Sequence, residues 1–435
     1  MSRPRTRVSR PRSEAFLRHP LTQLGSGYAI VLLLVYNYVL LRTAASFSWN
    51  DFGKFYYATL NWRSGLSMYA PTVATSLPVS TGLRLQFLDM NPPHFHLLLL
   101  PLVTLPIGTA ARVWLVLNAV SALTAIVMVV RELKLRVPIW QWMPLAVIGL
   151  LSVATNSNAV TAQCTGVLML PMTAAWLAAR RQQWVTCGVW LGVVIGVKPF
   201  LGLFLPVLAL RGQWRATVSA CLAGLVSSAV GVAVFGWSSY VEWIGALRSV
   251  SWVWGFMNGS IQALLARSLA PSPAFTPAVA ASWLIIPVWI IGSAVVAVVS
   301  YRATTRSLDH MFSVTILAAL LISPLGWTYY LWLAMPSLLS LWRTGPSWPT
   351  WVGLALLCVP LPLGTFGQPY WLATVTLASA YSWGLLFLWL GLVMRPQSEA
   401  ASAISTDASE WDTPSRQPRG VQADAFVLQR ESNHR

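Results

Sequence analysis

Residues 28–41 read YAIVLLLVYNYVLL, and residues 48–57 read SWNDFGKFYY. The first stretch is an unbroken apolar run without strand-like alternation, which is typical of a transmembrane helix. The second places a carboxylate, Asp51, directly after that run. We therefore expect a first helix at about 27–45 that carries Asp51 to one face of a membrane. A cleavable signal peptide is the alternative, but the many apolar runs that follow favour an uncleaved helix.

The composition of the whole chain is that of a polytopic membrane protein. Of 435 residues, 56% are hydrophobic and only 9% are charged, whereas soluble proteins carry about 25% charged residues. In hydrocarbon only helices and closed barrels satisfy every backbone hydrogen bond, and the continuous runs favour helices. The sequence predicts an all-α integral membrane protein with twelve transmembrane helices, at about 27–45, 109–130, 138–155, 163–179, 185–197, 199–210, 215–235, 281–300, 310–322, 327–342, 348–364 and 371–394.

Two longer segments, 46–108 and 236–280, are predicted to lie outside the bilayer on one face. Within the first, apolar residues recur at helical spacing, which predicts an amphipathic helix in the membrane interface: Phe52, Phe55, Tyr56 and Leu60. The apolar run at 94–107 is shorter than the about 20 residues of an upright span. Whether that run spans is left open by the sequence.

The placement of charge orients these helices. The net charge is +17, residues 1–20 carry six arginines against Glu14, and further cations lie in short loops between apolar runs. Positively charged loops stay in the cytoplasm, so we expect both termini there and Asp51 on the extracytoplasmic face of the inner or plasma membrane. The polar ends, 1–20 and 395–435, are predicted to be disordered and to flank a transmembrane catalytic domain at 21–394. Without a basic stripe on a soluble domain, nucleic acid is excluded as a partner.

Carboxylates are rare between residues 21 and 394, where only five occur: Asp51, Asp89, Glu132, Glu242 and Asp309. A base that takes the proton from an attacking hydroxyl group at the membrane surface must come from this set. Asp51 is favoured because it follows the first helix directly. The same residue could instead cap the next helix, and both roles remain open.

A second group of polar residues surrounds Asn91-Pro92-Pro93. Asp89, His94 and His96 are candidate substrate-binding residues there, and a solvated loop acid is the alternative reading for Asp89. Histidines at positions i and i+2 do not share a helix face, so a metal site would need an irregular backbone. The sequence requires no metal ion and no cofactor.

Lys198 lies at a proline break, in Gly196-Val197-Lys198-Pro199, between two short apolar helices. A lysine there is costly unless it pairs or faces a polar cavity, and an anionic leaving group such as a phosphate would be a partner. Snorkelling to lipid headgroups is the alternative. Arginines suit phosphate contacts, and aromatic rings suit either sugar stacking or an interfacial belt. On these grounds the further candidate substrate-binding residues are Arg248, Asn258, Arg267, Trp327, Tyr329 and Tyr330.

In their order along the chain, these runs resemble glycosyltransferase family 87 of the GT-C superfamily. The resemblance rests on Asp51-Phe52 with Tyr56-Tyr57-Ala58, Asn91-Pro92-Pro93-His94, Gly196-Val197-Lys198-Pro199, Asn258-Gly259-Ser260 with Arg267, and Ser323-Pro324 with Trp327. Two positions differ from the family pattern. The family often has a histidine after the Ser-Pro-x-x-Trp run, where this chain has Tyr329-Tyr330, and the usual Gly-Gln-x-Asn reads Ala162-Gln163-Cys164-Thr165.

The resemblance implies a polyprenyl-phosphate-sugar-dependent hexosyltransferase that moves a sugar, often mannose, to a hydroxyl group of a glycan or glycolipid acceptor at the outer face. It implies Asp51 as the catalytic base, and Lys198 with Arg267 or Arg248 would stabilise the departing lipid phosphate. Two other classes fit parts of the sequence. A lipid or small-molecule transporter fits the broken helix at Lys198 but not the lack of an internal repeat, and a catalytically inactive membrane scaffold fits the Tyr329-Tyr330 difference.

Overall fold

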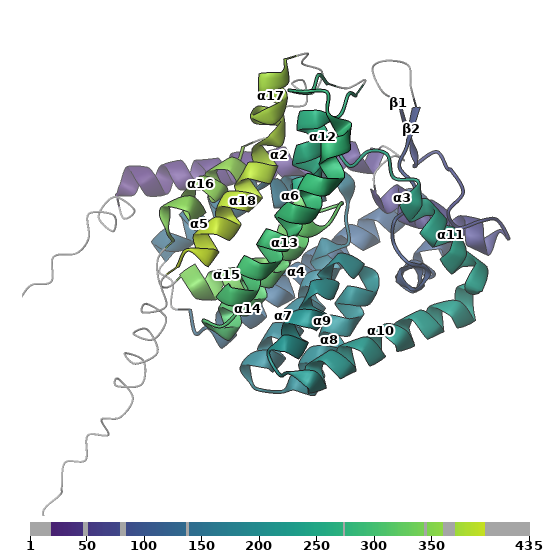
Figure 1. The fold of residues 1–435 in the computed structure, drawn as a ribbon, viewed down its shortest axis with the longest axis horizontal. Helices are drawn as coiled ribbons and strands as arrows, with labels where there is room; N and C mark the ends of the chain where they lie inside the picture. Colours follow the sequence, from purple (N-terminus) through teal and green to yellow (C-terminus); the bar gives the residue numbers. More distant parts are fainter. Residues whose placement is uncertain are drawn as a thin grey trace, which may run out of the picture. The chain divides into compact units, whose positions relative to one another are not determined.

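The computed structural model describes residues 19–46, 51–78, 84–135, 139–272, 275–342, 346–359 and 370–395. Within these residues the regular structure is helical, with one short antiparallel strand pair, β1 (Ser76–Pro78) and β2 (Arg84–Gln86), in which Leu77 is opposite Leu85 (Figure 1). Two isolated β-bridges, Asn258 with Trp327 and Ser272 with Phe275, join loops. The helical class is confirmed. The ends predicted to be disordered, 1–20 and 395–435, lie outside the described residues except for residues 19, 20 and 395.

The α-helices, in chain order, are α2 (Pro20–Ser46), α3 (Asp51–Arg63), α4 (Ile107–Glu132), α5 (Ile139–Leu151), α6 (Val153–Thr161), α7 (Thr165–Arg180), α8 (Trp184–Val197), α9 (Phe204–Leu210), α10 (Trp214–Phe235), α11 (Trp237–Arg248), α12 (Ile261–Leu269), α13 (Ile285–Ala303), α14 (Leu308–Ile322), α15 (Met335–Trp342), α16 (Trp348–Leu357), α17 (Trp371–Val375) and α18 (Ala380–Val393). Short 3-10 helices connect several of them: η1 (Pro93–Leu98), η2 (Leu102–Thr104), η3 (Pro199–Leu203), η4 (Ser282–Leu284), η5 (Thr328–Ala334) and η7 (Leu377–Ser379).

Among the described residues, five helical stretches are long and apolar enough to cross a membrane: Pro20–Arg42, Ile107–Glu132, Trp214–Phe235, Ser282–Ala303 and Trp371–Val393. The pair α5 and α6 would add a sixth, if its 50° bend belongs to one broken span. Several other apolar helices have 10–17 residues, which is short for an upright span. The several membrane-type helices are confirmed, and the number twelve is not.

The run at 94–107 does not form one continuous helix. Two 3-10 turns, η1 and η2, occupy it before α4 begins at Ile107. Prolines 93 and 101 lie at the start of these turns, and 3-10 geometry is used in short pieces of this kind. The run is therefore no span of its own. Its first turn, η1, packs against α10 and α11, and its second, η2, packs against α3 and α4.

Helix α3 begins at Asp51 and ends at Arg63, and Gly65 follows with a positive φ of 76°. The predicted helix is therefore present. Its apolar side packs on protein, because the Phe55 ring centroid lies 5.0 Å from that of Phe95 and the Phe52 centroid lies 5.9 Å from that of Trp114. The position of α3 in a membrane interface stays a prediction.

The break at Lys198 is confirmed, since α8 ends at Val197 and η3 begins at Pro199. Helix α8 is held against α10 by backbone-to-backbone approach. A Cβ atom at Gly188 or Gly192 would clash with the carbonyl oxygens of Ala216 and Ala220 on α10. The two glycines are therefore required for a contact that fixes the end of α8, and with it Lys198.

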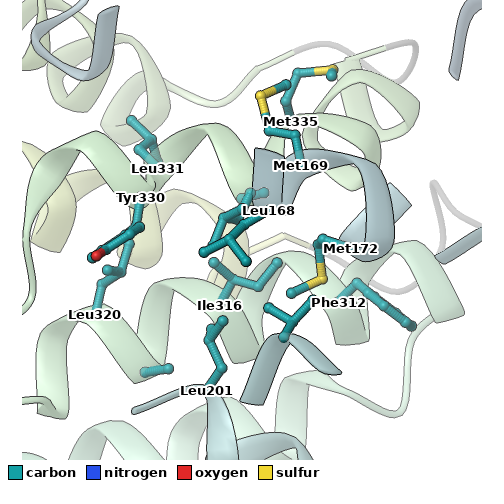
Figure 2. Close-up of a cluster of buried hydrophobic side chains, with 14 of the residues drawn as sticks. Leu168, Met169, Met172, Leu201, Phe312, Ile316, Leu320, Tyr330, Leu331 and Met335 are labelled. Atoms are coloured by element: carbon teal, nitrogen blue, oxygen red, sulfur yellow. The ribbon is translucent and has the colours of Figure 1, made fainter. Parts of the chain in front are cut away.

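The main core extends through most of the helices, and Figure 2 shows the part of it where α7 meets α14. Leu168, Met169 and Met172 of α7 pack there with Phe312, Ile316 and Leu320 of α14, together with Leu201, Tyr330, Leu331 and Met335. Almost every residue of α14 is buried. Because η5 continues from this core, the backbone that carries Tyr329 and Tyr330 is held by packing rather than left as a surface loop.

Candidate functional site

A cavity of 1020 Å³ opens among α3, α8, α11 and the segments that follow β2 and α14. Its size is at the upper end of ordinary small-molecule pockets, about 300–1,000 Å³. Its polar lining includes Asp51, Lys54, Asp89, Asn91, Gln163 and Lys198. These residues come from segments far apart in sequence, so the fold creates one polar site inside an otherwise apolar cavity.

Asp51 is the first residue of α3 and lines this cavity. One carboxylate oxygen, Oδ1, accepts a hydrogen bond from Lys54 Nζ at 2.7 Å, one helical turn along. The other, Oδ2, accepts one from Gln163 Nε2 at 2.7 Å. The Asp51 side chain is 17% exposed, so the carboxylate is oriented by two donors and can still be reached from the cavity.

Gln163 connects Asp51 to the opposite wall. Its Nε2 lies 3.1 Å from the hydroxyl oxygen of Tyr329, and its Oε1 accepts the backbone N–H of Cys164 at 3.0 Å. The residue before it, Ala162, ends α6 in the left-handed region with φ 49°, where glycine is normally favoured. The turn points Gln163 at Asp51. Sequence reasoning did not select this glutamine as a site residue, although it occupies the glutamine position of the family's Gly-Gln-x-Asn pattern.

Lys198 lies at the far side of the same cavity and is 9% exposed. Its ammonium group donates to Asn91 Oδ1 at 2.6 Å and lies 5.0 Å from the ring centroid of Tyr330. Asn91 in turn donates from Nδ2 to Asp89 Oδ1 at 2.7 Å. Two predicted residues, Lys198 and Asp89, are therefore brought together through Asn91, which sequence reasoning did not select.

Asp89 is buried, with its Oδ2 atom 3.0 Å from Nε2 of the buried His96. Burial raises the pKa of Asp89, but the contact with His96, the backbone N–H of Asn91 and the charge of Lys198 outweigh burial, so the pKa lies below its usual value. The ring of His96 is fixed on its other side by Thr59, whose Oγ1 lies 2.8 Å from Nδ1. His96 thus stands behind Asp89 and does not line the cavity.

His94 is separate from this chain of contacts. Its Nδ1 lies 3.0 Å from the hydroxyl oxygen of Tyr240, and its Nε2 faces Gly196 at the end of α8. Burial lowers the pKa of His94. The residue does not line the cavity, and among the described residues no group of three His, Cys, Asp or Glu side chains could hold a metal ion. A packing role in joining η1 to α8 and α11 explains its position.

Five aromatic residues form a continuous wall of the cavity, hereafter the aromatic wall: Phe87, Trp252, Trp327, Tyr329 and Tyr330. Neighbouring ring centroids lie 4.8, 5.5, 5.9 and 4.6 Å apart along this order. The three predicted residues Trp327, Tyr329 and Tyr330 are therefore part of the site. Phe87 and Trp252 were not predicted, because nothing in their local sequence distinguishes them from other aromatic residues.

Besides His94 and His96, three further predicted residues do not line the cavity: Arg248, Asn258 and Arg267. Arg267 is fully buried, and its three nitrogens donate to the hydroxyls of Ser379 and Ser382 and to three backbone carbonyls. This saturation argues against the expected contact with lipid phosphate. Asn258 is equally buried and joins its loop to Pro324, through a 2.7 Å bond from Nδ2 to the proline carbonyl. Arg248 is exposed at the end of α11.

Comparison with known proteins gives a consistent family assignment. The family model of glycosyltransferase family 87 matches residues 87–324, more than half of the chain. Two curated relatives, both named "Alpha-(1->3)-arabinofuranosyltransferase" and from Mycobacterium tuberculosis strains CDC 1551 and H37Rv, are 25% identical over 229 residues. The match covers 51% of this chain and 48% of each relative. The chain therefore spans about half the length of the curated relatives it matches.

Proposed function

Because the chain belongs to glycosyltransferase family 87, we propose that it transfers a sugar from a polyprenyl phosphate to a hydroxyl group of a glycan or glycolipid. Asp51 is the general base in this proposal, and the cavity beside α3 is the active site. The membrane-type helices support a donor that arrives from the bilayer. The twelve-span topology, the cytoplasmic termini and an extracytoplasmic active site are part of the same proposal.

The proposed reaction is a displacement at the anomeric carbon. The acceptor oxygen forms a bond to that carbon, the bond from carbon to phosphate oxygen breaks, and its electron pair leaves with the lipid phosphate. Asp51 takes the proton of the acceptor hydroxyl group. Lys198 lies in the same cavity and provides positive charge for the departing phosphate. Each step uses groups that line the cavity, without a metal ion.

The observation that carries this proposal is the arrangement of Asp51. The carboxylate is fixed by Lys54 and Gln163 at 2.7 Å each, yet it remains partly exposed in a cavity of 1020 Å³. A helix cap alone needs neither a glutamine from 112 residues away nor a cavity beside it. The geometry supports a positioned base, for which correct placement within hydrogen-bond reach of the substrate comes first.

The sugar has two candidates. The family resemblance suggests mannose, and the printed names of the two relatives suggest arabinofuranose. Each would arrive as a polyprenyl-phosphate sugar. We take mannose as the first candidate to test and arabinofuranose as the second.

Purified protein in lipid nanodiscs tests the proposal directly. Incubated with polyprenyl-phosphate mannose or polyprenyl-phosphate arabinofuranose and a glycan acceptor, it should release lipid phosphate and form glycoside in equal amounts. The Asp51→Asn variant should lose about 10²–10⁴-fold in turnover, the usual contribution of general-base catalysis, while its unfolding temperature stays near that of the parent.

The same assay separates the rival functions. A transporter would move the lipid across the bilayer without releasing phosphate, and a scaffold would do neither. Near-normal turnover by Asp51→Asn would remove Asp51 from the mechanism. Absence of transfer from both donors would count against the whole proposal.

A further inference from the structure

The two lysines of the cavity are held in different ways. Lys54 is paired directly with the carboxylate of Asp51 at 2.7 Å. Lys198 donates instead to a neutral carboxamide, Asn91 Oδ1, at 2.6 Å. Within the described part of the chain, no carboxylate oxygen lies within 4.0 Å of the Lys198 ammonium group. Lys198 is therefore fixed in position by a neutral group, and no carboxylate in direct contact offsets its positive charge.

The orientation of the Asn91 amide follows from its neighbours. Asp89 Oδ1 accepts from both the side-chain Nδ2, at 2.7 Å, and the backbone N–H of Asn91, at 3.0 Å. An ionised carboxylate can only accept hydrogen bonds, and an ammonium group can only donate them. Asn91 must therefore turn its NH₂ to Asp89 and its oxygen to Lys198. If the amide were flipped, its oxygen would face the carboxylate of Asp89 and its NH₂ would face the ammonium group of Lys198, so that two acceptors and two donors would be opposed.

The backbone around Asn91 leaves it little freedom. Its carbonyl oxygen accepts from the Tyr69 hydroxyl group at 2.6 Å, the residue is 2% exposed, and Pro92 follows it. A residue before proline is restricted to extended conformations. Asp89 is anchored in its turn by His96 at 3.0 Å. The whole set is buried and joined by hydrogen bonds up to the point where Lys198 meets the cavity.

We propose that Asn91 is a positioning residue that holds Lys198 as an available cation for the phosphate of the lipid donor, with Asp89 and His96 orienting Asn91 from behind. The inference rests on the proposed function, since it assigns the donor phosphate to Lys198. A carboxylate in place of Asn91 would hold the lysine equally well but would compete with the phosphate. The neutral amide gives placement without that competition, which is what preorganised charge stabilisation requires.

The test uses direct binding rather than turnover. The probe is geranylgeranyl phosphate titrated into the protein in detergent micelles, and geranylgeraniol, which lacks the phosphate, is the matched ligand. At pH 8, Asn91→Asp should weaken binding of the phosphate by about tenfold or more, as expected when a close opposite charge competes, and should leave binding of the alcohol unchanged. Asn61→Asp places the same charge on α3 and should change neither.

The pH profile separates positioning from a merely structural effect. The new carboxyl group at position 91 would face both Asp89, backed by His96, and Lys198. Two adjacent carboxyl groups tend to share a proton as the pH falls, and a protonated group there can again donate to Asp89 and accept from Lys198. The probe phosphate also gains a proton at about pH 6, and this change is common to all variants. The affinity of Asn91→Asp relative to that of Asn91→Leu, which cannot titrate at position 91, should therefore rise from pH 8 to pH 5.

Equal affinity of Asn91→Asp and parent for geranylgeranyl phosphate at pH 8 would overturn the inference, and so would an equal loss for the phosphate and the alcohol. Failure of the parent protein to prefer the phosphate over the alcohol would overturn it as well. If the parent binds the phosphate through Asn91 and Lys198 but transfers no sugar, the inference stands and the proposed glycosyl transfer fails. The two failures are therefore distinguishable.

Discussion

Gln163 is the residue whose contacts most directly link the proposed base to the rest of the site. It donates to Asp51 and to the Tyr329 hydroxyl group from the same nitrogen, and Cys164 fixes its other end. Gln163→Leu would leave Asp51 Oδ2 without its donor and free the carboxylate to rotate. We expect kcat to fall by about 10- to 100-fold, since a lost hydrogen bond to a charged group is worth about 1.5–3 kcal/mol, with little change in KM for the donor.

Steady-state kinetics over a range of donor concentrations would check this split between kcat and KM. Gln183→Leu is a suitable control, because Gln183 is exposed just before α8, outside the cavity lining. It should behave as the parent. A rise in KM with unchanged kcat in Gln163→Leu would mean that Gln163 contacts the donor instead of orienting Asp51.

At the residue scale, the sequence reveals charged site residues better than neutral ones. Asp51 and Lys198 are conspicuous because a charge among apolar runs needs a reason. Asn91 and Gln163 are ordinary polar residues until the fold places them 2.6 Å from Lys198 and 2.7 Å from Asp51. Arg267 shows the opposite error, since a buried arginine can be consumed entirely by carbonyl and hydroxyl oxygens of its own fold.

At the element scale, α4, α7 and α14 are joined by ionic contacts at the ends remote from the cavity. Asp309 accepts from Arg180 Nη1 at 2.6 Å and from Trp176 Nε1 at 2.7 Å. Glu132 lies 2.9 Å from Arg181 Nη2 and 3.5 Å from Arg180 Nε. The ionic cluster lies at the ends of these helices that are away from the cavity. It should therefore stabilise the helix bundle without affecting the proposed reaction at Asp51.

We expect Asp309→Asn to lower the free energy of unfolding by about 1–3 kcal/mol, because Arg180 would lose the closer of its two acidic partners in a partly buried cluster and keep only Glu132 at 3.5 Å. Thermal unfolding in detergent measures this, and turnover per folded molecule should stay at the parental value. Glu242→Gln, which alters a half-buried carboxylate that accepts a hydrogen bond from Ser67 Oγ but has no cationic partner among the described residues, is the control and should cost less than about 0.5 kcal/mol. Equal losses in the two variants would contradict a specific role for the cluster.

Helices could be predicted from the sequence where apolar residues form a long unbroken run. The expected helix at 215–235 corresponds to α10 at Trp214–Phe235, because a long apolar run has one stable solution in lipid. Helices α11 and α12 lie in the segment 236–280, which was predicted only as an outer segment. Their apolar residues are spaced along one face rather than in a run, so hydropathy alone passes over them.

For the whole molecule, stability should depend on pH through buried groups on the cavity side. Burial lowers the pKa of His94 from its usual 6.5. The unfolded chain therefore binds a proton at this residue more readily than the folded protein, and stability falls as the pH drops below about 6.5. The pKa of Asp89 is also lowered, from 3.8, but its contribution is complete above that value and is lost only in stronger acid.

His94 and Asp89 therefore affect stability in different pH ranges, and a variant of His94 isolates the contribution of that residue. We expect the unfolding temperature of the parent protein to decrease from pH 7.5 to pH 5, and His94→Gln, which retains polar atoms but does not titrate, to show a smaller decrease. The difference between the two curves removes the contribution of other titrating groups, which both proteins share. Parallel curves over this range would mean that His94 remains equally protonated in the folded and unfolded states, contrary to its burial between η1, α8 and α11.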